Sequence, residues 1–367
     1  MNRDITRRRL VGSAALAAGA GVVGVGGAGA KEYDTARILN YSEKMEYRPL
    51  GKTGLMVSAV CLGGHWKRLD TMLGRDFVGE GYKKEDFDNV NDAKFIANRT
   101  EVVSRSIDAG INYVDACAGP EILAYAKALR GRRQKMYFGY SWHVRESRFA
   151  EFQTAEALLR GLDEGMREAA LDYIDFWRIS LPMTRVSSLG ELKRVEEGAA
   201  GALMKAKKAG KIRVGGVSTH NRTWLAQLIK QYPEQIEAVL FPYTAATKQL
   251  PNDSIFEVVQ QYRVGVFAIK PFADNSLFVG DSSLHGQHRD EDDRRARMAI
   301  RYILGNPAIT APIPGLINAH QVENMAKAVA ERRELDREEK AELDTFGRHM
   351  WAHLRPHYQW LRDWEYA

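Results

Sequence analysis

The chain has 367 residues and a mass of 41.3 kDa, with 45% hydrophobic and 27% charged residues. This balance is typical of a folded globular protein and excludes a disordered chain or a collagen-like repeat. The net charge is +6, but four arginines against one aspartate within residues 1–30 contribute +3 of it. The other +3, without basic runs interleaved with aromatic residues, gives no support for a nucleic-acid partner.

The first 30 residues carry a sorting pattern. Residues 6–10 read TRRRL, and an apolar stretch of small residues follows at 12–27, then AGA at 28–30. This pattern resembles a twin-arginine export signal, and its apolar stretch is shorter than the roughly 20 residues of a membrane span. We therefore expect residues 1–30 to be removed on export to the periplasm or another extracytoplasmic space, without a stable membrane span. The GxGxxG string at 19–24 has no βαβ unit around it, so no dinucleotide site is predicted there.

Beyond a lead-in at 31–46, the chain alternates strand-like runs with helical periodicity. Residues 47–58 predict a hairpin. Short apolar or β-branched runs follow at 60–63, 112–115, 136–141, 174–180, 214–218, 238–243, 264–270 and 310–314. Helical periodicity lies between and after them, at 94–109, 121–132, 154–170, 192–209, 223–231, 254–262, 294–304 and 319–331. The pattern predicts one α/β domain over 47–335, a (β/α)8 TIM barrel with an N-terminal β-hairpin, and a helical C-terminal extension at 336–367.

In such a barrel the functional residues lie where the strands end. The strand ends offer Asp115, His143 and His220 as candidate catalytic groups, and the two histidines could act as acid or base near neutral pH. Two long loops, 67–92 and 273–293, leave the same face and have the length of lids or partner surfaces. The sequence leaves open a purely structural role for each of the three residues.

Two cysteines, Cys61 and Cys117, are too few for a cysteine-ligated zinc site or an iron–sulfur cluster. Strain across adjacent barrel strands favours two free thiols over a disulfide. Three histidines of the extension recur at a helical spacing, at His349, His353 and His357. Pro356 interrupts that helix, so no metal site is predicted. The tryptophans of the extension are interpreted as packing anchors; they are Trp351, Trp360 and Trp364.

Several motifs occur in the order typical of one enzyme family. They are YRPLGKTGL at 47–55, LGG at 62–64, GINYVD at 110–115, DYID at 172–175, GKIRVGGVS at 210–218, IPG at 313–315 and QVEN at 321–324. Over nearly all of its length beyond residue 46 the chain therefore resembles the aldo-keto reductases. STHN at 218–221 and IKP at 269–271 resemble the branch that often carries a C-terminal iron–sulfur segment, but without further cysteines no cluster is expected.

Aldo-keto reductases reduce carbonyls with NADPH through an Asp, Tyr, Lys and His tetrad, in which the tyrosine delivers a proton. The resemblance places Asp115 at the aspartate. Pro120, Ser141 and Ser180 stand where it implies the tyrosine, the lysine and the histidine. The usual mechanism is therefore not expected to operate.

The resemblance also implies contacts to NADP or NAD. The candidate cofactor-binding residues are Ser218, Thr219, Lys270, Pro271, Gly315, Gln321 and Asn324. Leu240 and Ile269 replace a glutamine and a stacking aromatic residue of the family, and no basic residue directly follows Gly315 to bind a 2′-phosphate. Lys270 and the N-terminus of the helix that begins near Ala319 could still hold a phosphate.

Two functions remain open from the sequence. The first is an exported oxidoreductase with tightly bound NAD(P) that acts on a small molecule by another mechanism. The second is a catalytically degenerate barrel, a pseudoenzyme that binds a ligand, a carbohydrate or a partner. Trp66, Trp142 and polar groups of the same face would serve that second function. The substrate and the oligomeric state do not follow from the sequence.

Overall fold

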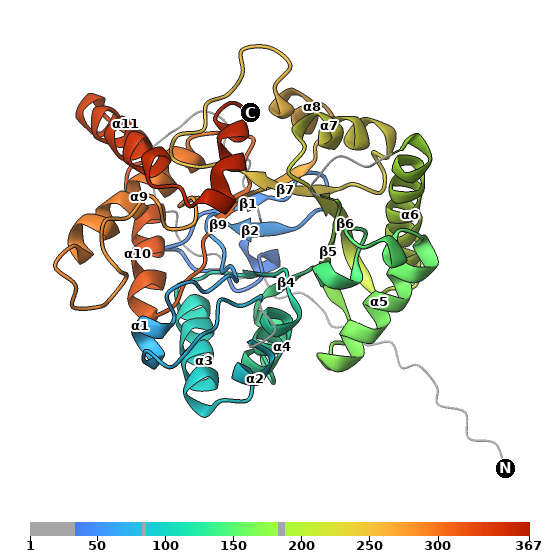
Figure 1. Cartoon of the computed structure of the whole chain (residues 1–367), viewed down its shortest axis with the longest axis horizontal. Coiled ribbons are helices and arrows are strands. Elements are labelled where there is room, and N and C mark those ends of the chain that lie inside the picture. Colours follow the sequence, from blue (N-terminus) through green and yellow to red (C-terminus); the bar gives the residue numbers. More distant parts are fainter. Residues whose placement is uncertain (1–33, 83–85, 183–187) are drawn as a thin grey trace, which may run out of the picture. The chain divides into compact units, whose positions relative to one another are not determined.

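Parallel strands and helices alternate along the part of the chain that this computed structural model describes, residues 34–82, 86–182 and 188–367. The expected export signal at 1–30 lies outside these ranges. The parallel sheet has the order β3-β4-β5-β6-β7-β8-β9. Its strands are β3 Tyr113–Ala116, β4 Tyr137–Tyr140, β5 Ile174–Ser180, β6 Ile212–Ser218, β7 Ala238–Pro242, β8 Gly265–Ile269 and β9 Ala311–Ile313. Each falls on an expected run, and neighbours in sequence are neighbours in the sheet (Figure 1).

The expected first strand at 60–63 is not a regular strand. Leu62 bridges to Val114 and Gly63 bridges to Gly315, each as a single parallel pair. These bridges join β3 to the segment after β9 and bring the ends of the sheet together. A Cβ on Gly63 would lie 2.7 Å from the Pro314 carbonyl oxygen, so this close approach requires glycine. The result is a nearly closed barrel of the TIM type.

The hairpin consists of β1 Tyr47–Pro49 and β2 Met56–Ser58, paired antiparallel. Its apolar side chains Leu50 and Val57 are buried in one cluster with Tyr113, Phe176 and Phe267 of the barrel strands. The hairpin therefore covers the N-terminal end of the barrel, because these side chains fill the interior on that side and leave the other end for function.

Helices surround the strands (Figure 1). They are α3 Ala93–Asp108, α4 Gly119–Ala128, α5 Ala155–Glu168, α6 Leu189–Lys208, α7 Arg222–Gln231, α8 Ile255–Gln261, α9 Arg289–Leu304 and α10 Ala319–Ala330. Two short helices, α1 Asp70–Leu73 and α2 Asp86–Asn89, lie within loop 67–92. Short 3-10 turns are η1 Thr35–Arg37, η2 Arg133–Lys135, η3 His143–Arg145, η4 Ala150–Phe152 and η5 Pro356–Trp364.

Most of these helices begin at a polar residue that accepts a hydrogen bond from the first turn. The capping side chains are Asp92, Thr154, Ser188, Asn221, Ser254, Asn318 and Asp336. Helix α9 begins at Arg289, five residues before the expected start at 294. Its first turn contains Asp290, Glu291 and Asp292, whose charges favour a helix N-terminus, so the preceding loop is shorter than the sequence suggested.

The C-terminal extension returns to the functional end of the barrel. Helix α11 Arg337–Ala352 packs against α9, and η5 then crosses toward β7. Trp364 is buried, stacks on Phe241 at 5.5 Å between ring centroids, and donates its indole N–H to the His220 carbonyl at 3.0 Å. The backbone of Ala367 pairs with that of Lys248 at 2.8 Å. Trp364 is thus a packing anchor of the expected kind.

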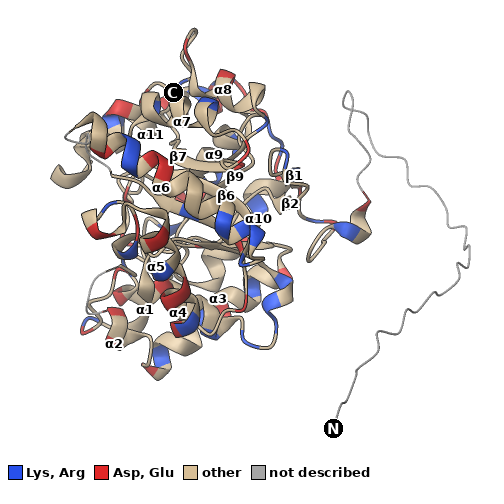
Figure 2. Cartoon of the chain, turned by 90° about the vertical axis from the view of Figure 1, so that its right-hand side faces the viewer, with Lys and Arg blue, Asp and Glu red and all other residues tan. Residues whose placement is uncertain are grey.

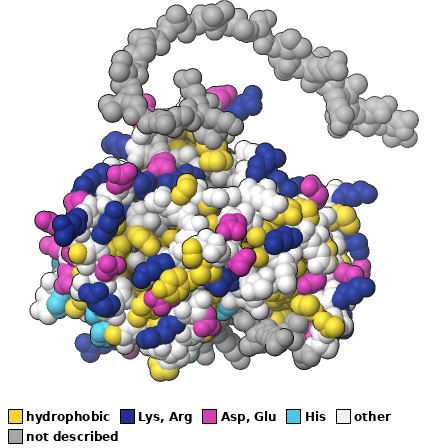
Figure 3. Space-filling model, turned by 90° about the horizontal axis from the view of Figure 1, so that it is seen from above, with side chains coloured by type: hydrophobic (Ala, Val, Ile, Leu, Met, Phe, Trp, Pro, Cys, Tyr) yellow, Lys and Arg dark blue, Asp and Glu magenta, His cyan; other side chains and the backbone are white. Residues whose placement is uncertain are grey.

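The outer surface mixes both signs of charge, as Figures 2 and 3 show for the helices and for one face of the molecule. Within residues 34–82, 86–182 and 188–367, none of the helices is both long and apolar enough to cross a membrane.

Candidate active site

Two adjoining cavities open at the C-terminal ends of the barrel strands. The central cavity, of about 400 Å³, lies over the ends of β3, β5, β6 and β8. The lateral cavity, of about 330 Å³, lies between loop 273–293 and the start of α10. Lys67, Phe272, Asn275 and Gly315 line both cavities, so the two meet at these residues.

All ten site residues predicted from the sequence line one of these cavities. The central cavity is lined by Asp115, His143, Ser218, Thr219, His220, Lys270 and Pro271. The lateral cavity is lined by Gln321 and Asn324, and Gly315 lies at the junction. The fold therefore brings together residues from the ends of β3, β4, β6, β8 and β9 and from α10.

Asp115 is held by an arginine that the sequence analysis did not single out. Arg178, which projects from β5, donates to both carboxylate oxygens, with Nη2–Oδ2 at 2.6 Å and Nε–Oδ1 at 3.1 Å. Tyr113 adds a hydroxyl donor at 3.1 Å. Burial opposes the charge on Arg178, but Asp115 outweighs it and raises the pKa of the guanidinium. Asp115 thus has a permanently charged, positive partner.

The two serines at the expected lysine and histidine positions meet on one buried carboxylate. Glu146 accepts from the Ser141 hydroxyl at 2.5 Å and from the Ser180 backbone N–H at 2.7 Å. Its other oxygen accepts from the Trp177 indole N–H at 3.0 Å. Glu146 therefore ties the ends of β4 and β5 together. Pro120, at the expected tyrosine position, lies in the first turn of α4, where its missing N–H costs nothing.

The two candidate histidines differ in their environments. His143 Nδ1 lies 2.8 Å from the Cys117 carbonyl oxygen, which can only accept, so Nδ1 carries the hydrogen and Nε2 is the acceptor. Burial lowers the pKa of His143, which keeps the ring neutral. His220 stacks on Trp360 at 3.6 Å, and burial together with Lys270 and Arg148 lowers its pKa to about 2. This favours His143 over His220 as the acid–base group.

Lys270 lies beneath two aromatic rings of the extension. Its ammonium is 5.0 Å from the ring centre of Tyr358 and 5.5 Å from that of Trp360. Burial lowers the pKa of Lys270 to about 8. Its charge is therefore partly released near neutral pH, and a bound anion would restore it.

Both long loops and the extension meet beside Lys270. Lys67 of the first loop forms an ion pair with Asp274 of the second, and both side chains are buried. Arg355 of the extension reaches the same carboxylate at 3.4 Å. Arg68 adds a bond to the Gly280 carbonyl at 2.5 Å. The loops are thus clamped to each other over the junction of the cavities.

A third group of polar side chains lines the central cavity where α4 begins. His65 Nδ1 lies 2.6 Å from Glu121 Oε1, and the Cys117 sulfur lies 3.4 Å from Nδ1 and 3.6 Å from Nε2. Cys61 and Cys117 are both free thiols, and Cys61 is buried. Among the residues that the structure describes, His65, Cys117 and Glu121 are the candidate metal-binding group. The sequence predicts no metal site, because nothing in it links His65 to Cys117 and Glu121 across more than 50 positions.

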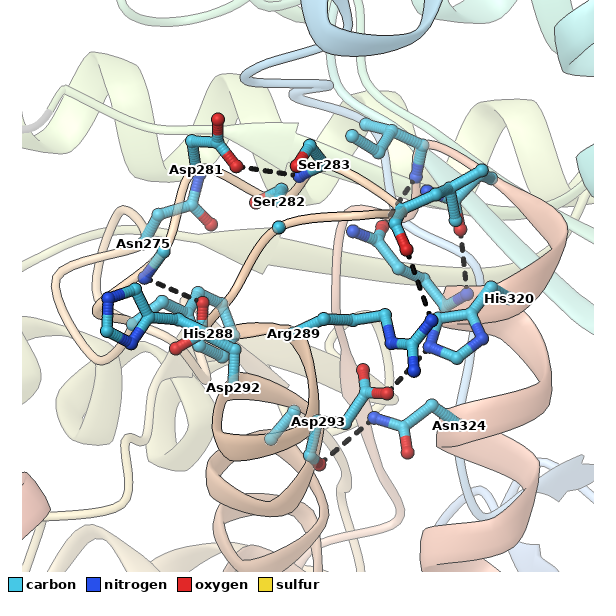
Figure 4. Close-up of a pocket in the computed structure, with 18 of the residues that line it drawn as sticks. Asn275, Asp281, Ser282, Ser283, His288, Arg289, Asp292, Asp293, His320 and Asn324 are labelled. Carbon is cyan, nitrogen blue, oxygen red and sulfur yellow. Dashed lines mark hydrogen bonds and ion pairs between the residues drawn. The ribbon is translucent and has the colours of Figure 1, made fainter.

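The lateral cavity is rich in paired polar groups (Figure 4). His320 Nε2 lies 2.6 Å from Asp293 Oδ2. Asn324 accepts from Arg297 at 2.7 Å and donates to the Asp293 carbonyl at 3.0 Å, so its amide is already engaged. Asn318 caps α10 by accepting from the Gln321 backbone N–H. The cavity wall is therefore largely set by bonds within the protein.

Two aromatic residues proposed for ligand contact do not reach a cavity. Trp66 and Trp142 are 0% and 2% exposed and pack in the core. Besides histidines, the aromatic side chains that line the central cavity are Tyr82, Phe272, Tyr358 and Trp360. The three spaced histidines do not form one face either. Helix α11 ends at Ala352, before His357, because Pro356 starts a separate turn.

The comparisons with known proteins identify the family. The model of the aldo/keto reductase family matches residues 87–348, so the chain belongs to this family. L-galactose dehydrogenase of Arabidopsis thaliana is 23% identical over 327 residues, which cover 82% of this chain and 94% of that protein.

Solved structures share the fold. An aldo-keto reductase of Klebsiella pneumoniae in complex with NADPH is 18% identical with a TM-score of 0.57, covering 80% of this chain and 93% of its own. The holo form of an aldo-keto reductase of Bacillus halodurans is 19% identical with a TM-score of 0.55, covering 82% and 96%.

Proposed function

We propose that the protein is an exported, NAD(P)-linked oxidoreductase that acts on a small hydroxylated aldehyde or alcohol. One observation carries the proposal: all ten predicted residues line two adjoining cavities on the functional face of an aldo-keto reductase barrel. A dinucleotide has two halves. The nicotinamide half fits the central cavity, beside Ser218 and Lys270, and the adenosine half fits the lateral cavity along α10.

The relatives support both the cofactor and the substrate class. The Klebsiella pneumoniae protein is described with NADPH, and the Arabidopsis thaliana protein is named for a sugar, L-galactose. In this chain His320 of the lateral cavity is paired with Asp293, a carboxylate that would repel a 2′-phosphate. We therefore propose NAD in preference to NADP.

In this proposal the residues of the central cavity have other roles in the reaction than the four residues of the family tetrad. A bound nicotinamide supplies hydride exchange with the substrate carbon. Neutral His143, with Nε2 as the acceptor, is placed to take a proton from a substrate hydroxyl. The Asp115–Arg178 pair fixes the shape and charge of the cavity wall, and Lys270 is placed to attract an anionic group. This scheme needs no phenol at position 120.

Mass spectrometry of protein purified from its exported compartment, without added nucleotide, tests the cofactor proposal. We expect NAD to be released on denaturation. In calorimetric titrations of stripped protein, Lys270→Ala should weaken NAD binding about tenfold, the loss of one charge-assisted contact. Lys340→Ala, on the exposed face of α11, should bind like the wild type. A stripped protein that binds neither NAD nor NADP would refute the proposal.

The export proposal rests on residues 1–30, outside the described structure. We expect a mature protein that begins near Lys31 and is found outside the cytoplasm. Replacing Arg7 and Arg8 together with lysine should abolish export, while Arg3→Lys, outside the pair, should not. Protein that begins at Met1, or export that persists in the double variant, would overturn this proposal.

A ligand-binding barrel is the second candidate, and one observation favours it. Tyr82, Tyr358 and Trp360 put aromatic rings on the central cavity, a lining suited to the apolar faces of sugars. The titration separates the candidates, because a binding protein would take up a monosaccharide without NAD and would show no hydride exchange when both are present.

A further inference from the structure

Cys117, His65 and Glu121 form a contact group, here called the relay, that the proposed NAD site does not use. The sulfur packs against the imidazole, 3.4 Å from Nδ1 and 3.6 Å from Nε2, and Nδ1 lies 2.6 Å from Glu121 Oε1. All three residues line the central cavity. A thiol in contact with an imidazole that a carboxylate orients is a combination that activates nucleophiles in many enzymes.

The carboxylate is built to orient the imidazole. Glu121 is fully buried, and its Oε1 also accepts from the His65 backbone N–H at 2.5 Å, while Oε2 accepts from the Cys117 backbone N–H at 2.7 Å. A Cβ on Gly64 would overlap this carboxylate, so the backbone passes directly over it. His65 itself has φ of 55°, a strained conformation for a non-glycine residue. The backbone at His65 is therefore strained at the point where it contacts the Glu121 carboxylate.

The surroundings of the sulfur are electropositive. Cys117 interacts electrostatically with His65, Arg148, Arg178 and Lys270. It also precedes the N-cap of α4, a ten-residue helix whose positive end faces it. Reactive cysteines in proteins occur in electropositive, partly exposed settings of this kind.

The other groups that face the relay are few. Neutral His143 bonds the Cys117 carbonyl, and Tyr82 stacks on His65 at 4.7 Å between ring centroids. The cavity also holds Asp115, Lys67 and Tyr358. Asp115 is neutralised by Arg178, and Lys67 by Asp274. The balance around the sulfur is therefore set by His65, Arg148 and Lys270 against Glu121. Burial opposes a charge on His65, but Cys117 and Glu121 raise its pKa to about 10.

We propose that Cys117 is a nucleophile that adds reversibly to an aldehyde in the central cavity, activated by His65 and Glu121. The thiolate forms a bond from sulfur to the carbonyl carbon as the C=O π bond breaks. The His65 imidazolium gives its proton to the resulting alkoxide oxygen. The products are a neutral thiohemiacetal and a neutral imidazole, so atoms and charge balance without an oxidant. The substrate class rests on the proposed function.

A metal site is the competing assignment for the same three side chains. Both oxygens of Glu121 already accept N–H donors, and Nδ1 of His65 is committed to Glu121. A metal would have to displace these bonds, whereas a relay uses them as they stand. We therefore favour the relay, and the experiments below detect the metal.

Alkylation of the folded, full chain by iodoacetamide at pH 6 tests the activation. We expect one fast site, Cys117, that reacts at least tenfold faster than free cysteine. His65→Gln and Glu121→Gln should each slow the reaction at least tenfold. Cys61→Ala, which removes the buried thiol, should leave the rate unchanged. Thermal melting establishes that each variant is folded. Rates at pH 9 should converge among all folded forms, because a cavity-facing thiol is largely ionised there without an activating partner.

A rate at pH 6 equal to that of free cysteine, or one unaffected in folded His65→Gln, would overturn the proposal. So would a stoichiometric zinc ion that is lost in Cys117→Ser and that blocks alkylation until it is chelated, because the sulfur would then be a metal ligand.

Adduct formation is measured with glycolaldehyde labelled with ¹³C at the carbonyl carbon. We expect a protein-bound resonance, distinct from the aldehyde and its hydrate, that is absent in Cys117→Ser and present in Cys61→Ala. Calorimetry of Cys117→Ser with NAD separates the two proposals. Normal NAD binding without any wild-type adduct overturns this inference alone, whereas an adduct in a protein that binds no NAD overturns the proposed function alone.

Discussion

Two buried carboxylates, only six positions apart, line the same cavity with different partners. Asp115 ends β3 and is paired with Arg178, which cannot release its proton. Glu121 lies in the first turn of α4 and is paired with His65, which can. The comparison teaches that one strand–helix unit supplies both a fixed ion pair and a proton-transfer pair. Asp115 is held in a fixed ion pair, whereas Glu121 contacts a group that can exchange a proton.

The first prediction concerns carbonyl reduction at the part of the central cavity that contains Asp115. Reduction of simple aldehydes with NADPH should fall about 10²- to 10⁴-fold below ordinary rates of the family, because Pro120 and Ser141 stand where the resemblance implies the proton-donating tyrosine and its lysine. The Tyr113 phenol that bonds Asp115 is buried in the barrel interior. Absorbance of NADPH measures the rate. Turnover at ordinary rates by an unmodified preparation would show that another group has taken over the proton transfer in place of the tetrad.

The second prediction concerns the fixed pair. Arg178→Met should lower the free energy of unfolding by about 3 to 5 kcal/mol, because it leaves the Asp115 carboxylate buried without its partner. Urea denaturation measures this loss. Adding Asp115→Asn to Arg178→Met should recover part of it, since no charge then remains. If the double variant is as unstable as the sum of the single ones, the two residues are not coupled as described.

The third prediction concerns the titratable pair. The folded-state pKa of His65 is raised from 6.5 to about 10. The contribution of protonated His65 to the free energy of unfolding is therefore fully present below about pH 6.5. It is lost as the pH rises through about 10. With a third of the ring exposed, we expect a decrease on the order of 2 kcal/mol across this window. His65→Gln should remove this decrease, whereas His353→Gln, at the exposed C-cap of α11, should retain it.

The smallest effect is expected at the junction of the cavities. Arg355→Ala removes one exposed partner of Asp274 and should change the free energy of unfolding by less than about 1 kcal/mol, because the buried Lys67 pair remains. Amide hydrogen exchange of loop 273–293 should rise slightly. A large loss of stability would show that the extension, rather than the two loops, holds the cavities in place.

The barrel and the positions of its site could be predicted because they depend on local patterns. Strand-like runs followed by helical periodicity specify the strand–helix units, and side chains at strand ends must then lie on one face. This placed Asp115, His143, Ser218 and Lys270 on the same cavity. The segment 60–63 was predicted to be a regular strand, but it forms only single bridges. These depend on how closely the Pro314 backbone approaches Gly63, which the sequence pattern does not indicate.

The sequence by itself thus determined the α/β barrel and which side chains lie at the ends of its strands. Tertiary structure decided which charges are partners. Arg178 meets Asp115 across 63 positions, and His65 meets Glu121 across 56. Hydrophobic periodicity does not predict which residues far apart in the sequence form a pair. A strand pattern indicates only that a side chain points inward. The closure of the barrel determines which residue each inward-pointing side chain contacts. It therefore also determines whether a carboxylate has a fixed positive partner or one that can exchange a proton.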